Sequence, residues 1–133
     1  KAFVMERERF DGADVNHLLR SFGPKLDWAR LMRRFDRYWE VLLAQLVLFR
    51  FAYPSDRDNI PDPVLTELLS RAVDTLRQGN EEERVCRGNL LSSVNYRLDI
   101  EAWGYLDGRV WDEQKRGERA TGSELENQGG GDG

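Results

Sequence analysis

The chain has 133 residues, of which 40% are hydrophobic and 33% are charged, a composition typical of one globular domain. Its 20 Lys and Arg residues against 24 Asp and Glu residues give a formal charge of -4, whereas a general nucleic-acid binder is usually basic. A single cysteine and a single histidine exclude an internal disulfide framework, a Cys-rich zinc module and a multi-His metal site.

The first nine residues, KAFVMERER, begin with Lys1 and lack the apolar core of a signal peptide. We therefore expect the chain to be a C-terminal piece of a longer protein. Apolar residues at helical spacing predict a first helix in this segment. They predict a second helix that begins at Asp11 and is stopped by Gly23-Pro24.

Asp27 is expected to cap a third helix, whose apolar stripe runs from Trp28 to Phe35 and whose arginines point outward. Residues 38–53 carry apolar side chains on nearly every helical face, which is typical of a central, buried helix. This segment is too short and too interrupted by polar residues to span a membrane, so no membrane partner is expected.

Pro63 favours the first turn of a fifth helix, which keeps one apolar face up to Gly79. Residues 85–88 predict a short extended piece, and residues 92–103 predict another, less regular helix. Residues 105–111 predict a last short extended segment that would complete one small strand pair.

The final segment, residues 112–133, carries almost no apolar side chains and ends in a glycine-rich run. Such a segment buries too little apolar surface to offset the entropy of ordering it, which predicts a disordered tail. We therefore predict an all-α protein, in which a compact bundle of about six helices over residues 1–111 precedes the tail.

Two acidic groups could in principle hold a metal ion. Asp11, Asp14 and His17 fall on one helical face, but acidic first turns are also common at helix starts, and that interpretation is the simpler one. A second group lies in the loop between the predicted fourth and fifth helices: Asp56, Asp58 and Asp62. It lacks the glycine and the terminal glutamate of a calcium loop, which favours solvated loop charge.

No catalytic motif stands out. Cys86 lies between Arg84 and Arg87, which could lower the pKa of its thiol, but a buried free cysteine more often serves packing. The sequence contains no G-x-S-x-G, P-loop, G-x-G-x-x-G or H-E-x-x-H motif.

The third predicted helix and its end carry a basic stripe: Arg30, Arg33, Arg34 and Arg37. Residues 1–37 contain nine Lys or Arg against six Asp or Glu, so the local charge opposes that of the whole chain. The stripe could face the phosphates of a nucleotide or RNA, or it could be a solvated helix face with acidic neighbours in reach. The aromatic residues around it are expected to pack in the core: Trp28, Phe35, Tyr38 and Trp39.

The opening segment, residues 1–19, combines Lys1 with the run Arg9-Phe10-Asp11-Gly12-Ala13-Asp14. It resembles the distal part of bacterial nucleotidyltransferase-fold proteins of the small, antitoxin-system-associated kind. In these proteins a lysine-bearing helix leads into an Arg/Lys-x-x-Asp-x-x-Asp-type motif. Further stretches are similar to one bacterial subgroup, in the order residues 26–28, 39–43, 46–49, 51–54 and 84–92. The resemblance covers roughly residues 1–110.

The family's Gly-Ser or Gly-Gly turn with a paired Asp-x-Asp does not occur in this chain. The resemblance therefore implies that the catalytic half lies upstream, and that magnesium and a nucleoside triphosphate serve the full-length protein, with no cofactor for this chain alone. It implies a nucleotide-binding role for Lys1, Arg9, Asp11 and Asp14, and we expect no metal site here.

Together these observations predict a cytoplasmic, non-catalytic C-terminal helical domain of a nucleotidyltransferase-like protein. It would help to form the nucleotide side of an active site and would be an enzyme only together with the upstream half. Its expected partners are that half, or a chain that supplies it, and a nucleotide; nucleic acid is not expected. The alternative is a standalone helical protein–protein interaction module, whose groove is lined by the apolar helix over residues 38–53.

Overall fold

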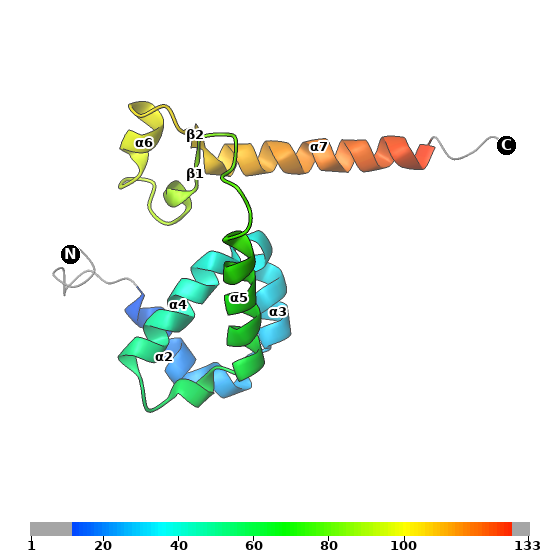
Figure 1. Ribbon diagram of the computed structural model, residues 1–133. Coiled ribbons are helices and arrows are strands. Elements are labelled where there is room, and N and C mark those ends of the chain that lie inside the picture. The colour runs from blue at the N-terminus through cyan, green and yellow to red at the C-terminus, as the bar shows by residue number, and fades with distance from the viewer. Residues whose placement is uncertain (1–11, 129–133) are drawn as a thin grey trace. The chain divides into compact units, whose positions relative to one another are not determined.

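The computed structural model describes residues 12–128, and the side chains of residues 12–121. Helices dominate this part of the chain and one two-stranded sheet accompanies them, so the prediction of a mostly helical fold with one small strand pair is confirmed (Figure 1). Within the described range, none of the helices combines the length and the apolar character that crossing a bilayer requires.

The chain divides into two compact units, Lys1–Gly79 and Asn80–Gly133. The predicted domain end at residue 111 does not coincide with this division. Residues 79–84, which span the division, contain only glycine, asparagine, glutamate and arginine, a composition typical of a linker between compact units.

The described part of the first unit contains α2 (Ala13–Phe22), α3 (Trp28–Phe35), α4 (Trp39–Ala52) and α5 (Asp62–Thr75). Short 3-10 turns connect them: η1 (Gly23–Lys25), η2 (Asp36–Tyr38) and η3 (Arg57–Asn59). Helix α4 packs against α2, α3 and α5, so its predicted central position is confirmed. The helix predicted before Asp11 lies outside the described residues.

The end of α2 lies where Gly23-Pro24 predicts it. The Trp28 indole N–H donates to the Gly23 carbonyl at 2.9 Å, and the Asn59 side-chain amide donates to the Arg20 carbonyl at 2.9 Å. A Cβ on Gly23 would stand 2.7 Å from the Asn59 carbonyl oxygen, so this close approach requires glycine. These contacts tie the end of α2 to α3 and η3.

The first unit has one apolar core, formed by Leu19, Trp28, Leu42, Leu46, Phe49, Ile60 and Leu68. Phe35 and Trp39 pack against it as predicted, whereas Arg37 lies over the ring of Tyr38, 5.0 Å from its centroid. The prediction that α4 is buried on nearly every face is wrong, since Phe51 on this helix is 84% exposed. The reason is that α2, α3 and α5 cover only part of its circumference.

Asp27 caps α3 as predicted: its carboxylate accepts a hydrogen bond from the Arg30 backbone N–H at 3.0 Å. We expect Asp27→Ala to lower the free energy of unfolding by about 1 kcal/mol, because one N–H of the first turn then loses its protein partner. Urea unfolding followed by circular dichroism measures this change. The control Asp58→Ala removes an acidic side chain from the exposed turn η3, and a loss of the same size there would contradict the capping role.

In the second unit, β1 (Val85–Cys86) pairs in parallel with β2 (Leu106–Asp107). Between them in the sequence lie η4 (Gly88–Leu90) and α6 (Arg97–Glu101), and α7 (Gly108–Gln128) follows β2. The helix predicted over residues 92–103 is therefore much shorter than expected. The residues before it form turns, and the ring of Tyr96 packs so closely on Gly88 that a Cβ there would overlap it.

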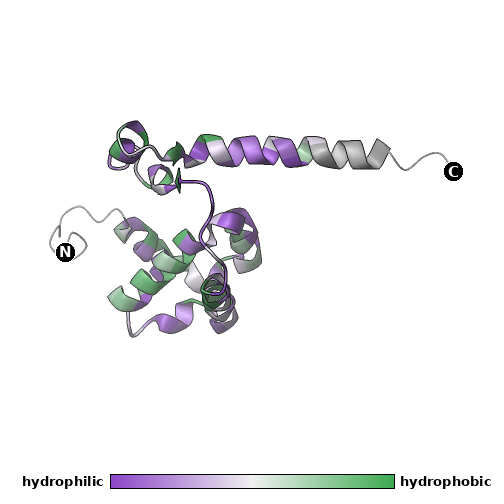
Figure 2. Cartoon of the chain, turned by 45° about the horizontal axis from the view of Figure 1, so that its top comes forward, coloured by the Kyte–Doolittle hydropathy of each residue, from purple (hydrophilic) through white to green (hydrophobic). Residues whose placement is uncertain are grey.

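Helix α7 continues to Gln128, so the segment predicted to be disordered from residue 112 is helical as far as the structure describes it. A local contact favours this helix: Lys115 pairs with Glu118, three positions along, at 3.0 Å. The coloured part of α7 in Figure 2 is mostly hydrophilic. The prediction of disorder used composition, which indicates how much apolar surface a segment can bury. Composition does not exclude a helix, because a helix satisfies its backbone hydrogen bonds within the segment itself.

The second unit has several side-chain polar contacts, and no large hydrophobic side chain among residues 80–121 is fully buried. The Arg87 guanidinium donates to the Asp112 carboxylate at 3.2 Å, which joins the β1–η4 segment to α7. The Asn89 amide donates to Asp107 at 2.6 Å. The side-chain hydrogen bond from Arg109 lowers the pKa of Asp107 to about 2, so this carboxylate is ionised at neutral pH.

Candidate functional site

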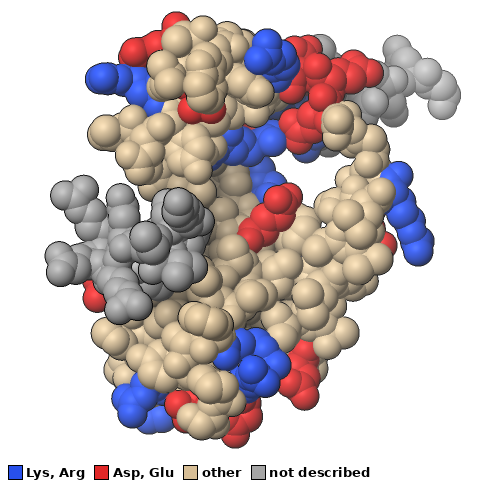
Figure 3. All heavy atoms as spheres, turned by 60° about the vertical axis from the view of Figure 1, so that its left-hand side comes forward, with Lys and Arg blue, Asp and Glu red and all other residues tan. Residues whose placement is uncertain are grey.

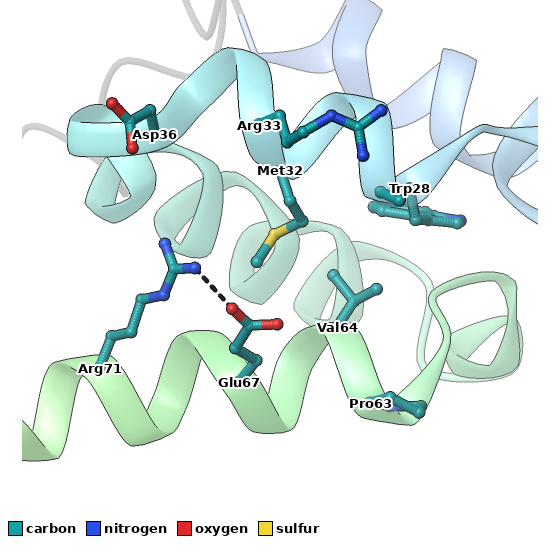
Figure 4. Close-up of a pocket in the computed structure, with 9 residues that line it drawn as sticks. Trp28, Met32, Arg33, Asp36, Pro63, Val64, Glu67 and Arg71 are labelled. Atoms are coloured by element: carbon teal, nitrogen blue, oxygen red, sulfur yellow. Dashed lines mark hydrogen bonds and ion pairs between the residues drawn. The ribbon is translucent and has the colours of Figure 1, made fainter.

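A cavity of about 460 Å³ lies between α3 and α5 (Figure 4). Its apolar lining comes from Trp28, Ala29, Met32, Pro63 and Val64. Its charged lining comes from Arg33, Asp36, Glu67 and Arg71. The cavity therefore combines an apolar wall with charges of both signs and is partly open to solvent.

Helical spacing explains why these residues share one space. On α3 and just after it, the lining residues run from Trp28 to Asp36 at intervals of one or three positions. Those on α5 run from Pro63 to Arg71 at intervals of one, three and four positions. Residues three and four positions apart lie on the same side of a helix. Both helices pack against α4, so the core of the first unit sets the distance between the two walls.

The charged side chains give the cavity two different ends. Arg71 donates to one carboxylate oxygen of Glu67 at 2.5 Å. Arg33 has no ion-pair partner among the residues that the structure describes. In Figure 4 the Arg33 guanidinium points toward Trp28, whereas Arg71 and Asp36 lie at the other end of the cavity. One end is thus basic, and the other carries both signs of charge.

Of the four arginines predicted to face phosphate, the structure brings Arg33 to the cavity. Arg30 and Arg34 are exposed on α3 and Arg37 is exposed in η2, so their predicted outward orientation is confirmed. Asp14 is exposed in the first turn of α2. No hydrogen bond or ion pair among the described residues joins it to these arginines.

The other predicted nucleotide-binding residues, Lys1, Arg9 and Asp11, lie outside the described residues. Among the described side chains, residues 12–121, no group of three or more His, Cys, Asp or Glu residues lies close enough together to hold a metal ion. His17 is exposed on α2, and Cys86 is partly buried in β1.

Sequence reasoning missed Asp36, Glu67 and Arg71 as members of the site. The spacing of Glu67 and Arg71 by four positions predicts an ion pair on a helix surface, and this is the local signal that could have drawn attention to them. The sequence contains no indication that the pair lies opposite Arg33, because that placement depends on how α3 and α5 pack on α4.

Comparison of the chain with models of protein families, with curated proteins and with solved structures finds no significant match. The resemblance to nucleotidyltransferase-fold proteins accordingly stays a prediction. The cavity between α3 and α5 and the arginines of α3 are the features from which a function can be argued.

Proposed function

We propose that this chain is a non-catalytic helical module that binds the phosphates of a nucleotide, in a nucleotidyltransferase-like protein whose catalytic half lies upstream. The observation that carries the proposal is the arginine face of α3, formed by Arg30, Arg33 and Arg34. All three are exposed, and none has an ion-pair partner among the described residues. Their spacing gathers the three guanidinium groups on neighbouring positions of one helix.

A guanidinium group suits phosphate because its N–H donors match the geometry of two phosphate oxygens. An arginine already paired with a carboxylate would have to give up that partner first. Arg33 is the arginine that also borders a cavity, so a bound phosphate there could continue into a larger ligand. In the proposed full-length protein, magnesium would neutralise phosphate charge and would be held by carboxylates of the upstream half.

The expected ligand is a compact polyanion rather than an extended nucleic acid. On the face drawn in Figure 3, basic and acidic side chains are interspersed. Nucleic-acid binding usually relies on a continuous basic surface that contacts many phosphates. The arginine face of α3 is short by comparison, since α3 has 8 residues.

Calorimetric titration with inorganic tripolyphosphate tests the proposal. We expect the chain to bind tripolyphosphate, and Arg33→Ala to weaken this binding by about tenfold, equivalent to about 1.4 kcal/mol. The control Arg57→Ala removes an equal charge from the exposed turn η3, away from the cavity, and is expected to change binding little. Absence of binding, or equal weakening by both substitutions, would contradict the proposal.

A second candidate function is a protein–protein interaction module, and one observation favours it. Helix α2 carries an apolar stripe of Val15, Leu18 and Phe22, whose exposed fractions are 40%, 57% and 51%. Side chains at this spacing form one face of a helix, and such a face is a common site of protein contact. If no phosphate compound binds in the titration above, this candidate replaces the first.

A further inference from the structure

We propose that the uncovered face of α4 binds the same face of a second copy of this chain, so that two α4 helices pack antiparallel in a homodimer. This inference goes beyond the proposed phosphate binding and does not depend on it. Three observations support it: the apolar composition of the face, the spacing of its side chains, and the placement of one acidic and one basic residue toward its two ends.

The face is an apolar strip on the side of α4 that α2, α3 and α5 leave uncovered. Its members recur at intervals of three and four positions, which places them on one side of a helix. They are Val41, Ala44, Leu48 and Phe51, with Val47 beside them. Leu48 is half-buried, whereas Val41, Val47 and Phe51 are 40%, 49% and 84% exposed. Apolar side chains exposed side by side, rather than singly, indicate a contact site.

The spacing of the strip fits a reversed copy of itself. A two-fold axis at the level of Gln45 matches each position of one helix with the position equally far on the other side of Gln45 in the partner. Ala44 of one copy then lies between the levels of Leu48 and Ala44 of the partner, and Leu48 lies between those of Ala44 and Val41. The side chains therefore interdigitate, and the small Ala44 near the axis allows the two helices to approach closely.

Two charged residues favour a second copy in this antiparallel orientation. Glu40 is exposed just before the strip and Arg50 is half-buried near its end, and neither has an ion-pair partner among the described residues. The two residues lie at equal distances from Gln45 and differ by about 80° around the helix axis. The two-fold axis thus brings Glu40 to the level of the partner's Arg50, on the same flank of the strip, and the contact occurs twice. A parallel pair would bring like charges together instead.

The size of the strip predicts a reversible dimer. From Val41 to Phe51 it is about 15 Å long, so it buries less surface than a standard stable interface. We expect a dissociation constant of about 10 μM. The monomer predominates below this concentration, with Phe51 in contact with water.

Sedimentation velocity of the full chain tests the proposal over concentrations from about 1 to about 200 μM, on both sides of the expected dissociation constant. The average mass is expected to rise from that of one chain toward that of two. Phe51→Ala should weaken the dimer at least about tenfold, because a symmetric interface loses the ring twice. The control Leu76→Ala shortens a side chain that is 82% exposed at the end of α5, outside the strip, and should leave the dimer unchanged.

Charge reversal tests the orientation of the two helices. Glu40→Arg alone or Arg50→Glu alone should weaken the dimer about tenfold, since each places like charges together at both ends of the interface. The two substitutions combined restore opposite charges and should recover most of the lost affinity. The control Asp58→Arg makes the same change of charge in the exposed turn η3 and should have no effect. Circular dichroism of each variant checks that its helices are retained.

Three results would overturn the proposal. A chain that stays monomeric up to the highest concentration would assign the strip to a different occupant. A dimer that Phe51→Ala leaves unchanged would have its interface elsewhere. A dimer that each single reversal weakens but the combined reversal does not restore would lack the antiparallel pairing of Glu40 with Arg50. None of these results would affect the titration with tripolyphosphate.

Discussion

Replacing Phe49 by alanine is expected to lower the free energy of unfolding of the first unit by about 3–5 kcal/mol. Phe49 is fully buried on α4, and its ring centroid lies 5.3 Å from that of Tyr53. Truncation removes apolar contacts and leaves a cavity at the helix that α2, α3 and α5 share. Urea unfolding followed by the helical circular dichroism signal measures the loss.

Phe51 provides a matched control on the same helix, because it is 84% exposed. Phe51→Ala is expected to change the free energy of unfolding by no more than about 0.5 kcal/mol. The two substitutions remove the same atoms, so their difference isolates burial. Equal losses for the two variants would mean that α4 does not present the described face to the core.

The second large effect is expected in the second unit, where Asp112→Ala should cost about 1–3 kcal/mol. The Asp112 side chain is 6% exposed and accepts from Arg87, whose side chain is 38% exposed. Removing the carboxylate leaves the guanidinium without its main partner on α7. The exposure of Arg87 limits the loss, because water can solvate part of the guanidinium after the substitution.

Amide hydrogen exchange is the suitable measurement for this variant, since it reports on each unit separately. We expect faster exchange in β1, η4 and the start of α7, with unchanged exchange in α4. The control Glu113→Ala removes the neighbouring acidic side chain, which is exposed, and should leave the protection pattern as it is. Loss of protection in α4 as well would mean that Asp112 also stabilises the first unit.

The proposed site depends on the same core as the stability of the first unit. Trp28 belongs both to the core and to the cavity, and Met32 and Val64 connect the two. Variants that loosen α4, such as Phe49→Ala, are therefore expected to weaken ligand binding indirectly, by changing the distance between the walls. Arg33→Ala acts on an exposed side chain and avoids this complication.

Several features of this protein follow from the sequence by itself. Gly23-Pro24 ends α2, Asp27 caps α3, and Arg30 and Arg34 of α3 face outward, all as the local pattern predicts. Each depends on residues a few positions apart: a cap bonds the next turn, and helical periodicity assigns each side chain to a face. Such local interactions can be predicted without knowledge of the rest of the chain.

Other features were decided only by the tertiary structure. The cavity joins Arg33 of α3 to Glu67 of α5, which are distant in the sequence and lie together because both helices pack on α4. The exposure of Phe51 likewise depends on which neighbours cover α4, since an apolar residue on a helix does not by itself indicate a partner. Packing between distant segments selects which side chains meet, and local sequence patterns carry no information about that choice.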